Sequence, residues 1–139
     1  MNQNNTTHHE QFMRRCFQLA MLGTSYTAPN PMVGAVLVYK NRIIGEGYHA
    51  HFGAAHAEVN CINSVQENDK KHIAEATLYV SLEPCAHHGK TPPCADLILK
   101  HNIQKVVISV QDNYNAVNGK GIERLRTNGV EVTTGILET

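Results

Sequence analysis

The chain has little that would draw it to a membrane or to a polyanion. It contains no tryptophan and three phenylalanines, and no apolar run approaches the ~18 residues that a membrane-spanning helix needs. Twelve Lys and Arg residues are balanced by twelve Asp and Glu residues. The chain therefore has no net positive charge that would attract nucleic acid or an acidic membrane surface. The polar N-terminus lacks the apolar segment of a signal peptide. These absences predict a cytoplasmic protein with no nucleic-acid and no membrane partner.

Length and composition indicate one packed domain. The chain has 139 residues, of which 42% are hydrophobic and 17% are charged, values that are ordinary for a folded domain. Residues 1–9 are polar and are expected to form a disordered leader. A single domain is therefore expected over residues 10–139.

Hydrophobic periodicity predicts an α/β fold. Helices are expected over 10–22, 56–65, 94–100 and 120–128, and strands over 33–39, 43–48, 77–82, 105–110 and 130–133. The charged segment 66–76 is expected to be a loop. A turn at 40–42 joins the first two strands into a hairpin, and later strands alternate with helices. This order predicts a mixed sheet between helix layers, a three-layer α/β/α sandwich.

Two short motifs only superficially resemble nucleotide-binding loops. Segment 89–91 (GKT) lacks the glycine that a phosphate-binding loop needs five residues earlier, because Pro84 stands there. Segment 45–50 (GEGYHA) fits the loose dinucleotide pattern, but no helix opens directly after it. Gly45 and Gly47 instead indicate a bulge or a close approach between backbones.

Four cysteines and nine histidines are the unusual part of the composition. In a reducing compartment cysteines are core residues, catalytic thiols or metal ligands. Cys16 and Cys61 lie on the apolar pattern of predicted helices, which favours a place in the core. Cys85 and Cys94 flank a polar segment instead.

His56, Cys85 and Cys94 form a candidate metal site. One imidazole and two thiolates suit zinc, and three protein ligands leave the fourth position for water, as in catalytic zinc sites. Cys94 follows two prolines and is expected to begin a helix, whose N-terminus favours a thiolate. The alternative is a pair of core cysteines with a capping histidine, but the polar segment between the cysteines is poor core material.

Glu58 is the candidate proton carrier. The order His-x-Glu followed by Pro-Cys is typical of zinc deaminases, in which the glutamate is not a ligand. It would take a proton from the attacking water and deliver protons to a ring nitrogen and the leaving amine. The second cysteine comes after eight residues rather than two, so the short-spaced deaminases are not a direct match. The alternative is an ordinary glutamate near a helix N-terminus.

Longer segments resemble a known family, the pyrimidine deaminases of bacterial riboflavin biosynthesis, within the cytidine-deaminase-like superfamily. The resemblance extends over about 13–138 and is carried by 29–38 (PNPMVGAVLV), 45–49 (GEGYH), 56–60 (HAEVN), 82–94 (LEPCAHHGKTPPC), 118–125 (NGKGIERL) and 129–138 (GVEVTTGILE). It implies a five-stranded mixed sheet, one zinc ion per chain held by His56, Cys85 and Cys94, and Glu58 as proton shuttle. The implied reaction removes the 2-amino group of 2,5-diamino-6-(5-phosphoribosylamino)pyrimidin-4(3H)-one by hydrolysis. Its products are 5-amino-6-(5-phosphoribosylamino)uracil and ammonia.

A phosphorylated pyrimidine needs further contacts. Asn30 between two prolines and His49 at the end of the hairpin are candidates for the pyrimidine edge, and Lys90 with His87 for the phosphate. Asp112 is a candidate for a ribose hydroxyl. The family usually has Asp-Pro-Asn-Pro there, whereas this chain has Asp-Asn-Tyr-Asn at 112–115, so Tyr114 stands where the family has its asparagine.

Two other functions stay open: a zinc deaminase of another nucleobase or nucleoside, and a non-catalytic zinc-binding module. The family often joins this domain to an NADPH-dependent reductase. No reductase domain, and hence no NADP, is expected within these 139 residues. As partners we expect a reductase domain, either in a longer form of the same chain or on a separate chain, and further copies of this chain in a homo-oligomer.

Overall fold

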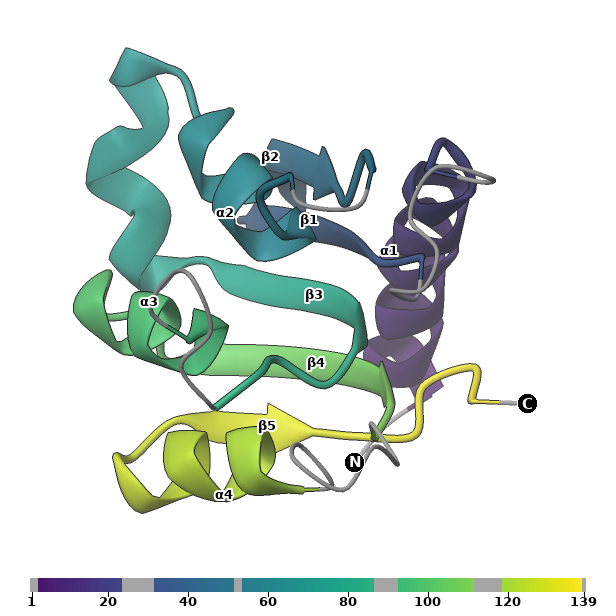
Figure 1. Cartoon of the computed structure of the whole chain (residues 1–139), viewed down its shortest axis with the longest axis vertical. Helices are drawn as coiled ribbons and strands as arrows, with labels where there is room; N and C mark the ends of the chain where they lie inside the picture. The colour runs from purple at the N-terminus through teal and green to yellow at the C-terminus, as the bar shows by residue number, and fades with distance from the viewer. Residues whose placement is uncertain (1–2, 24–31, 52–53, 87–92, 112–118, 139) are drawn as a thin grey trace.

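A computed structural model of the chain places a mixed five-stranded sheet at its centre (Figure 1). It describes residues 3–23, 32–51, 54–86, 93–111 and 119–138, with the side chains of 3–6 left aside. The strands are β1 (Gly34–Tyr39), β2 (Arg42–Tyr48), β3 (Thr77–Leu82), β4 (Lys105–Val110) and β5 (Glu131–Thr133), in the spatial order β2-β1-β3-β4-β5. β1 is antiparallel to β2 and β3, whereas β3, β4 and β5 are parallel. The predicted mixed sheet is confirmed.

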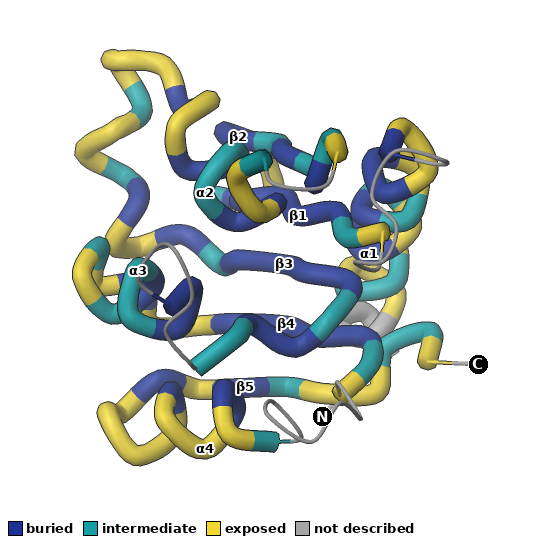
Figure 2. The backbone as a smooth tube through the Cα atoms, viewed as in Figure 1, coloured by how far each residue is buried: buried dark blue, intermediate teal, exposed yellow. Residues whose placement is uncertain are grey.

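Helices cover both faces of the sheet. One face packs against α1 (Gln3–Met21), and the other packs against α2 (Ala57–Asn63), α3 (Cys94–Lys100) and α4 (Lys120–Thr127). Side chains alternate between the two cores along each central strand, as strand geometry requires: in β1, for example, Val36 faces α1 and Leu37 faces the other layer. The central strands are buried almost throughout (Figure 2). The α/β/α sandwich is therefore confirmed, with α1 in one layer and α2, α3 and α4 in the other.

Two segments differ from their prediction. α1 begins at Gln3, so residues 3–9 are helical where a disordered leader was expected. A distant partner explains this, because the His9 ring lies 2.8 Å from the Tyr79 hydroxyl on β3. Segment 66–76 was expected to be a loop but forms a 3₁₀ helix, η1 (Glu67–Glu75). There the His72 ring stacks on Tyr39 at a centroid distance of 4.0 Å.

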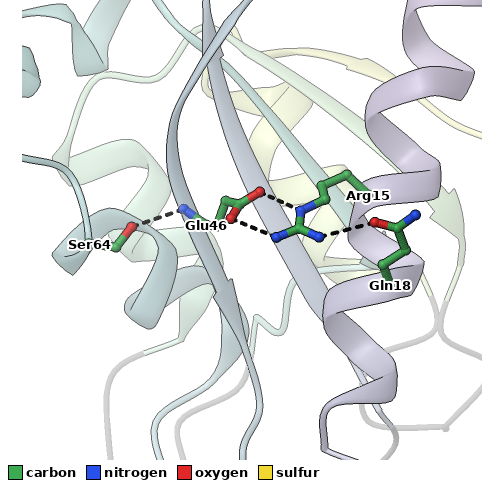
Figure 3. A network of polar contacts seen from close by, with 4 residues as sticks. All are labelled: Arg15, Gln18, Glu46 and Ser64. Atoms are coloured by element: carbon green, nitrogen blue, oxygen red, sulfur yellow. Dashed lines mark hydrogen bonds and ion pairs between the residues drawn. The ribbon is translucent and has the colours of Figure 1, made fainter.

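A polar network joins edge strand β2 to both helix layers (Figure 3). Arg15 on α1 donates two hydrogen bonds to Glu46 on β2, at 2.6 and 3.0 Å, and a third to Gln18. On the opposite side the Glu46 amide donates to the Ser64 hydroxyl at 2.9 Å, just after α2. Both helix layers are thus fastened to the same strand.

Within the described ranges, no helix combines the length and the apolar character that membrane crossing requires.

Candidate metal centre and active site

Three helix and strand ends bring the predicted ligands together. His56 directly precedes α2, Cys94 is the first residue of α3, and Cys85 lies three residues beyond the end of β3. Residues 29 and 38 positions apart in sequence thus meet at one end of the strands. This is where open α/β sheets commonly bind ligands, beyond the carboxyl ends of parallel strands.

The spacing of the three ligand atoms suits a tetrahedral zinc ion. His56 Nδ1 lies 3.4 Å from Cys94 Sγ and 3.9 Å from Cys85 Sγ, and all three atoms lie within 4.8 Å of one another. Zinc–nitrogen and zinc–sulfur bonds of ordinary length at a tetrahedral angle place N and S about 3.6 Å apart. His56 is exposed, Cys85 intermediate and Cys94 buried, so the centre is open on the histidine side.

Backbone-to-backbone packing sets the position of His56. A Cβ on Gly47 would lie 2.3 Å from the Cys61 nitrogen, and one on Gly45 would lie 2.7 Å from the Cys61 oxygen. Both glycines therefore allow α2 to rest directly on β2, which confirms the close approach predicted for them. The Asn60 side-chain amide donates to the carbonyls of Tyr48 and Ala55, at 2.9 and 3.2 Å. The segment that leads into His56 is held by these contacts.

The two candidate cysteine ligands also contact each other. The Cys94 amide donates to Cys85 Sγ at 3.2 Å, and the Ala95 amide donates to the Cys85 carbonyl at 3.0 Å. Hydrogen bonding from the Cys94 thiol, and then from His56, lowers the pKa of Cys85 to about 4. The same interaction raises the pKa of Cys94, because the Cys94 thiol must keep its proton in order to donate this hydrogen bond. Zinc binding must displace that proton, so metal uptake depends on pH.

Glu58 is buried beside the ligand cluster. It lies in the first turn of α2 and is 4% exposed. Burial raises its pKa to about 7, since the low-dielectric surroundings disfavour the charged carboxylate. Interactions with His56 and with the Cys94 thiol act in the opposite direction. A carboxyl group in this position is suited to taking up and returning protons near neutral pH.

Of the five predicted substrate contacts, one falls in the described residues. His49 is 3% exposed, its Nδ1 lies 3.2 Å from the Ala55 carbonyl oxygen, and its ring stands edge-on to the His56 ring at a centroid distance of 5.5 Å. It is therefore adjacent to the metal centre. The other four, Asn30, His87, Lys90 and Asp112, lie outside the described residues.

Two residues of this site were not singled out from the sequence. Asn60 fixes the segment before His56, and the buried Glu83 accepts hydrogen bonds from the backbone amides of Gly119 and Ile122. The sequence could have pointed to Glu83, because it is a charged residue between an apolar strand and the candidate ligand Cys85. Its partners are 36 and 39 residues away, so nothing local revealed them.

The family described as the cytidine and deoxycytidylate deaminase zinc-binding region matches residues 6–110. The chain belongs to this family of zinc-binding deaminases. The match covers His56, Glu58, Cys85 and Cys94, and it bears out the fold, zinc and family expected from the sequence.

Individual members of the deaminase family show which kind of deaminase this chain resembles. The riboflavin biosynthesis protein RibD of Bacillus amyloliquefaciens is 50% identical over 128 residues, 92% of this chain and 33% of that protein. The diaminohydroxyphosphoribosylamino-pyrimidine deaminase of Buchnera aphidicola is 44% identical over 126 residues, 91% of this chain and 83% of that protein. The chain spans about a third of the length of its RibD relatives.

A solved relative agrees with this deaminase fold. The crystal structure of a diaminohydroxyphosphoribosylaminopyrimidine deaminase/5-amino-6-(5-phosphoribosylamino)uracil reductase from Thermotoga maritima superposes with a TM-score of 0.90. It is 48% identical, and the match covers 96% of this chain and 38% of that chain. The three-layer architecture is therefore that of a solved deaminase.

Proposed function

We propose that the chain removes the 2-amino group of 2,5-diamino-6-(5-phosphoribosylamino)pyrimidin-4(3H)-one by hydrolysis. The products are 5-amino-6-(5-phosphoribosylamino)uracil and ammonia. The observation that carries the proposal is the buried Glu58 beside the His56, Cys85 and Cys94 cluster. Support for this substrate comes from the similarity to the Buchnera deaminase, which carries the name of that activity.

The chain's own residues account for binding the metal and moving the protons. His56, Cys85 and Cys94 hold the metal; when bound, zinc supplies a water acidic enough to attack near neutral pH. Beside a dication, the Glu58 carboxyl group shifts toward its ionised form, which is the form that accepts a proton. Glu58 then takes one proton from the attacking water and gives it to the ring nitrogen. It carries the second proton to the amino group, which leaves as ammonia, while the water oxygen becomes the new carbonyl oxygen.

Substrate recognition is the second part of the proposal. His49, next to His56, is assigned to the pyrimidine edge together with Asn30. Lys90 and His87 are assigned to the phosphate, and Asp112 to a ribose hydroxyl. A charge-assisted contact from lysine to phosphate is stronger than a neutral hydrogen bond and would select the phosphorylated compound.

The zinc content, the assembly, the location and a partner reductase are also part of the proposal. One zinc ion per chain, a homo-oligomeric assembly and a cytoplasmic location fit a metabolic deaminase. The solved Thermotoga maritima relative, of which the match covers 38%, has a name that joins deaminase and reductase activities. A reductase on the same or a separate chain would therefore act on the product.

An ammonia-release assay with four compounds tests the assignment. The phosphoribosylaminopyrimidine should be deaminated, whereas its dephosphorylated form, cytidine and guanine should react little. Lys90→Ala should weaken use of the phosphorylated compound and leave the zinc content unchanged, with Lys71→Ala on η1 as the exposed control. Equal rates with and without phosphate would contradict the role of Lys90. A preference for cytidine or guanine would replace this function with the deamination of another base or nucleoside, and no turnover of any compound would favour a binding module.

A further inference from the structure

Glu83 is a buried carboxylate that the reaction above does not use. It is 4% exposed and lies between the end of β3 and the ligand Cys85. Its two oxygens accept hydrogen bonds from different backbone amides at the start of α4: Gly119 at 2.9 Å and Ile122 at 3.0 Å. The N-cap of α4 is Gly119, which has no side chain to cap the helix. Glu83, the residue directly after β3, therefore supplies the acceptors that a capping side chain would normally provide.

The first turn of α4 is also in direct backbone contact with the residue before Cys85. A Cβ on Gly121 would lie 1.8 Å from the Pro84 carbonyl oxygen. Any larger residue would push α4 away from the Pro84–Cys85 peptide. The short chain from β3 to Cys85 is thus held by two hydrogen bonds through Glu83 and by close packing at Gly121.

A second contact connects α4 with the other cysteine ligand. Arg124 on α4 donates a hydrogen bond to Asp96, which lies two residues after Cys94 in the first turn of α3. α4 therefore touches the segments that carry both thiolate ligands, although it contributes no ligand itself. Both members of this ion pair are partly exposed, with side-chain exposures of 47% and 29%, so Glu83 is expected to be the more important of the two connections.

We propose that Glu83 is a positioning residue for the metal centre. Its carboxylate clamps the start of α4 against the Pro84–Cys85 segment and thereby fixes Cys85 for metal binding. Partners outside the ligand set commonly orient metal ligands in this way, and their loss typically lowers metal affinity by about 10–100-fold. The inference rests on the proposed function only in taking zinc as the resident metal, and it does not depend on which pyrimidine is deaminated.

A carboxylate is needed at this position because both of its partners are donors. Glutamine has nearly the same shape, but its amide offers one acceptor oxygen and a donor NH₂ group. In Glu83→Gln, one backbone amide would therefore face another donor inside a buried site. Glu123→Gln is the matched control, since Glu123 lies in the same first turn of α4 and is exposed.

The test measures the metal itself. The zinc-loaded chain and both variants are mixed with excess chromophoric chelator, and the rate of zinc release is followed. Cobalt-substituted samples are compared by absorption, whose thiolate-to-metal and d–d bands report the ligand geometry. We expect zinc release from Glu83→Gln to be about 10–100-fold faster than from the parent chain, with altered cobalt bands. Glu123→Gln should match the parent chain in both measurements.

A purely structural role for Glu83 gives a different result. Urea unfolding of the metal-free proteins would then show a less stable Glu83→Gln, while zinc release and the cobalt bands stayed those of the parent. That result would overturn the proposal. If Glu83→Gln does not accumulate as folded protein, the same measurements on Glu83→Asp decide, because the shorter carboxylate cannot hold both amides equally well. Parent-like zinc release from that variant would also overturn it.

The proposed reaction can fail separately. If the parent chain retains zinc but does not deaminate the pyrimidine, the proposed function is wrong. The role of Glu83 is then still tested by the rates of zinc release.

Discussion

The four cysteines occupy two kinds of surroundings and differ sharply in their chemistry. Cys16 and Cys61 are fully buried in the two hydrophobic cores, one on each side of the sheet. Burial raises the pKa of Cys16 to about 12 and also raises that of Cys61. At the metal centre, hydrogen bonding from Cys94 lowers the pKa of Cys85 to about 4 although that thiol is half-buried.

The contrast shows that burial does not by itself decide what a thiol does. Cys85 Sγ accepts a hydrogen bond from the Cys94 amide, at the N-terminus of α3, and faces His56 Nδ1. These donors stabilise a thiolate. Cys16 and Cys61 lie inside helices, in apolar surroundings that favour the neutral thiol. The same residue type is therefore a candidate metal ligand in one region and a small core side chain in the other.

Removing one cysteine from each region should produce the largest difference in zinc content and turnover. Cys85→Ala deletes a ligand, so we expect zinc to be lost and turnover to be abolished. Cys61→Ala should keep one zinc per chain and full activity and cost about 1–3 kcal/mol of stability through the lost core volume. Elemental analysis, the ammonia assay and urea unfolding measure these effects. Full zinc retention with activity in Cys85→Ala would contradict the assignment of this ligand.

Glu58→Gln should separate proton transfer from metal binding within the site. The amide fills nearly the same space, but it cannot take up and return a proton. Turnover is expected to fall by roughly 10²–10⁴-fold, while the zinc content remains that of the parent chain. Activity within a few-fold of the parent would make Glu58 a structural residue of α2. Glu75→Gln, an exposed carboxyl on η1, is the control.

The buried carboxyl group also predicts a pH dependence of stability. The pKa of Glu58 is about 7 in the folded, metal-free chain and near its ordinary value of about 4.3 when unfolded. The folded state therefore binds more protons between these two values, and its stability should fall as pH rises through that range. The expected loss is about 3 kcal/mol. Urea unfolding of chelator-treated protein between pH 4 and pH 8 measures it.

Glu58→Gln again provides the comparison. Other groups of the metal centre titrate in both proteins, so the difference between the two stability curves isolates Glu58. The variant should gain stability relative to the parent as pH rises. Parallel curves would mean that the pKa of Glu58 is not raised by folding.

The smallest effect is expected at the Arg15 network, on the side of α1 (Figure 3). Arg15 and Glu46 are 41% and 32% exposed as side chains, and exposed ion pairs contribute about 0–1 kcal/mol. Arg15→Gln should therefore change the unfolding free energy by less than about 1 kcal/mol and leave zinc release unaltered. Accelerated zinc release would show that the α1 layer also influences the metal centre.

Local sequence patterns were sufficient for much of the fold and for the ligand set. Alternating and apolar runs predicted all five strands, with differences of one residue at their ends. His56 and Cys94 could be placed at helix starts because two prolines precede Cys94 and helical periodicity follows both residues. The pair Gly45 and Gly47 predicted a close backbone contact, although not that α2 was the partner.

Segments stabilised by distant partners were predicted less well. Residues 3–9 are polar and have little local tendency to be ordered, yet His9 meets Tyr79 seventy residues away. The 3₁₀ helix η1 similarly packs against the β1–β2 hairpin through His72 and Asp69, which contact Tyr39 and Arg42. Their order depends on contacts that no local pattern contains.

The sequence alone determined which atoms are available for chemistry and in what order they occur. Residue type decides which side chains can bind a metal or transfer a proton. The imidazole of His56, the thiols of Cys85 and Cys94 and the carboxyl group of Glu58 can therefore be identified from short stretches of sequence. Only the tertiary structure decided which thiol has the lower pKa, how far burial raises the pKa of Glu58, and that Glu83 accepts hydrogen bonds from the start of α4. These properties depend on dielectric surroundings and on hydrogen-bond donors, and both come from residues that are brought together only by folding.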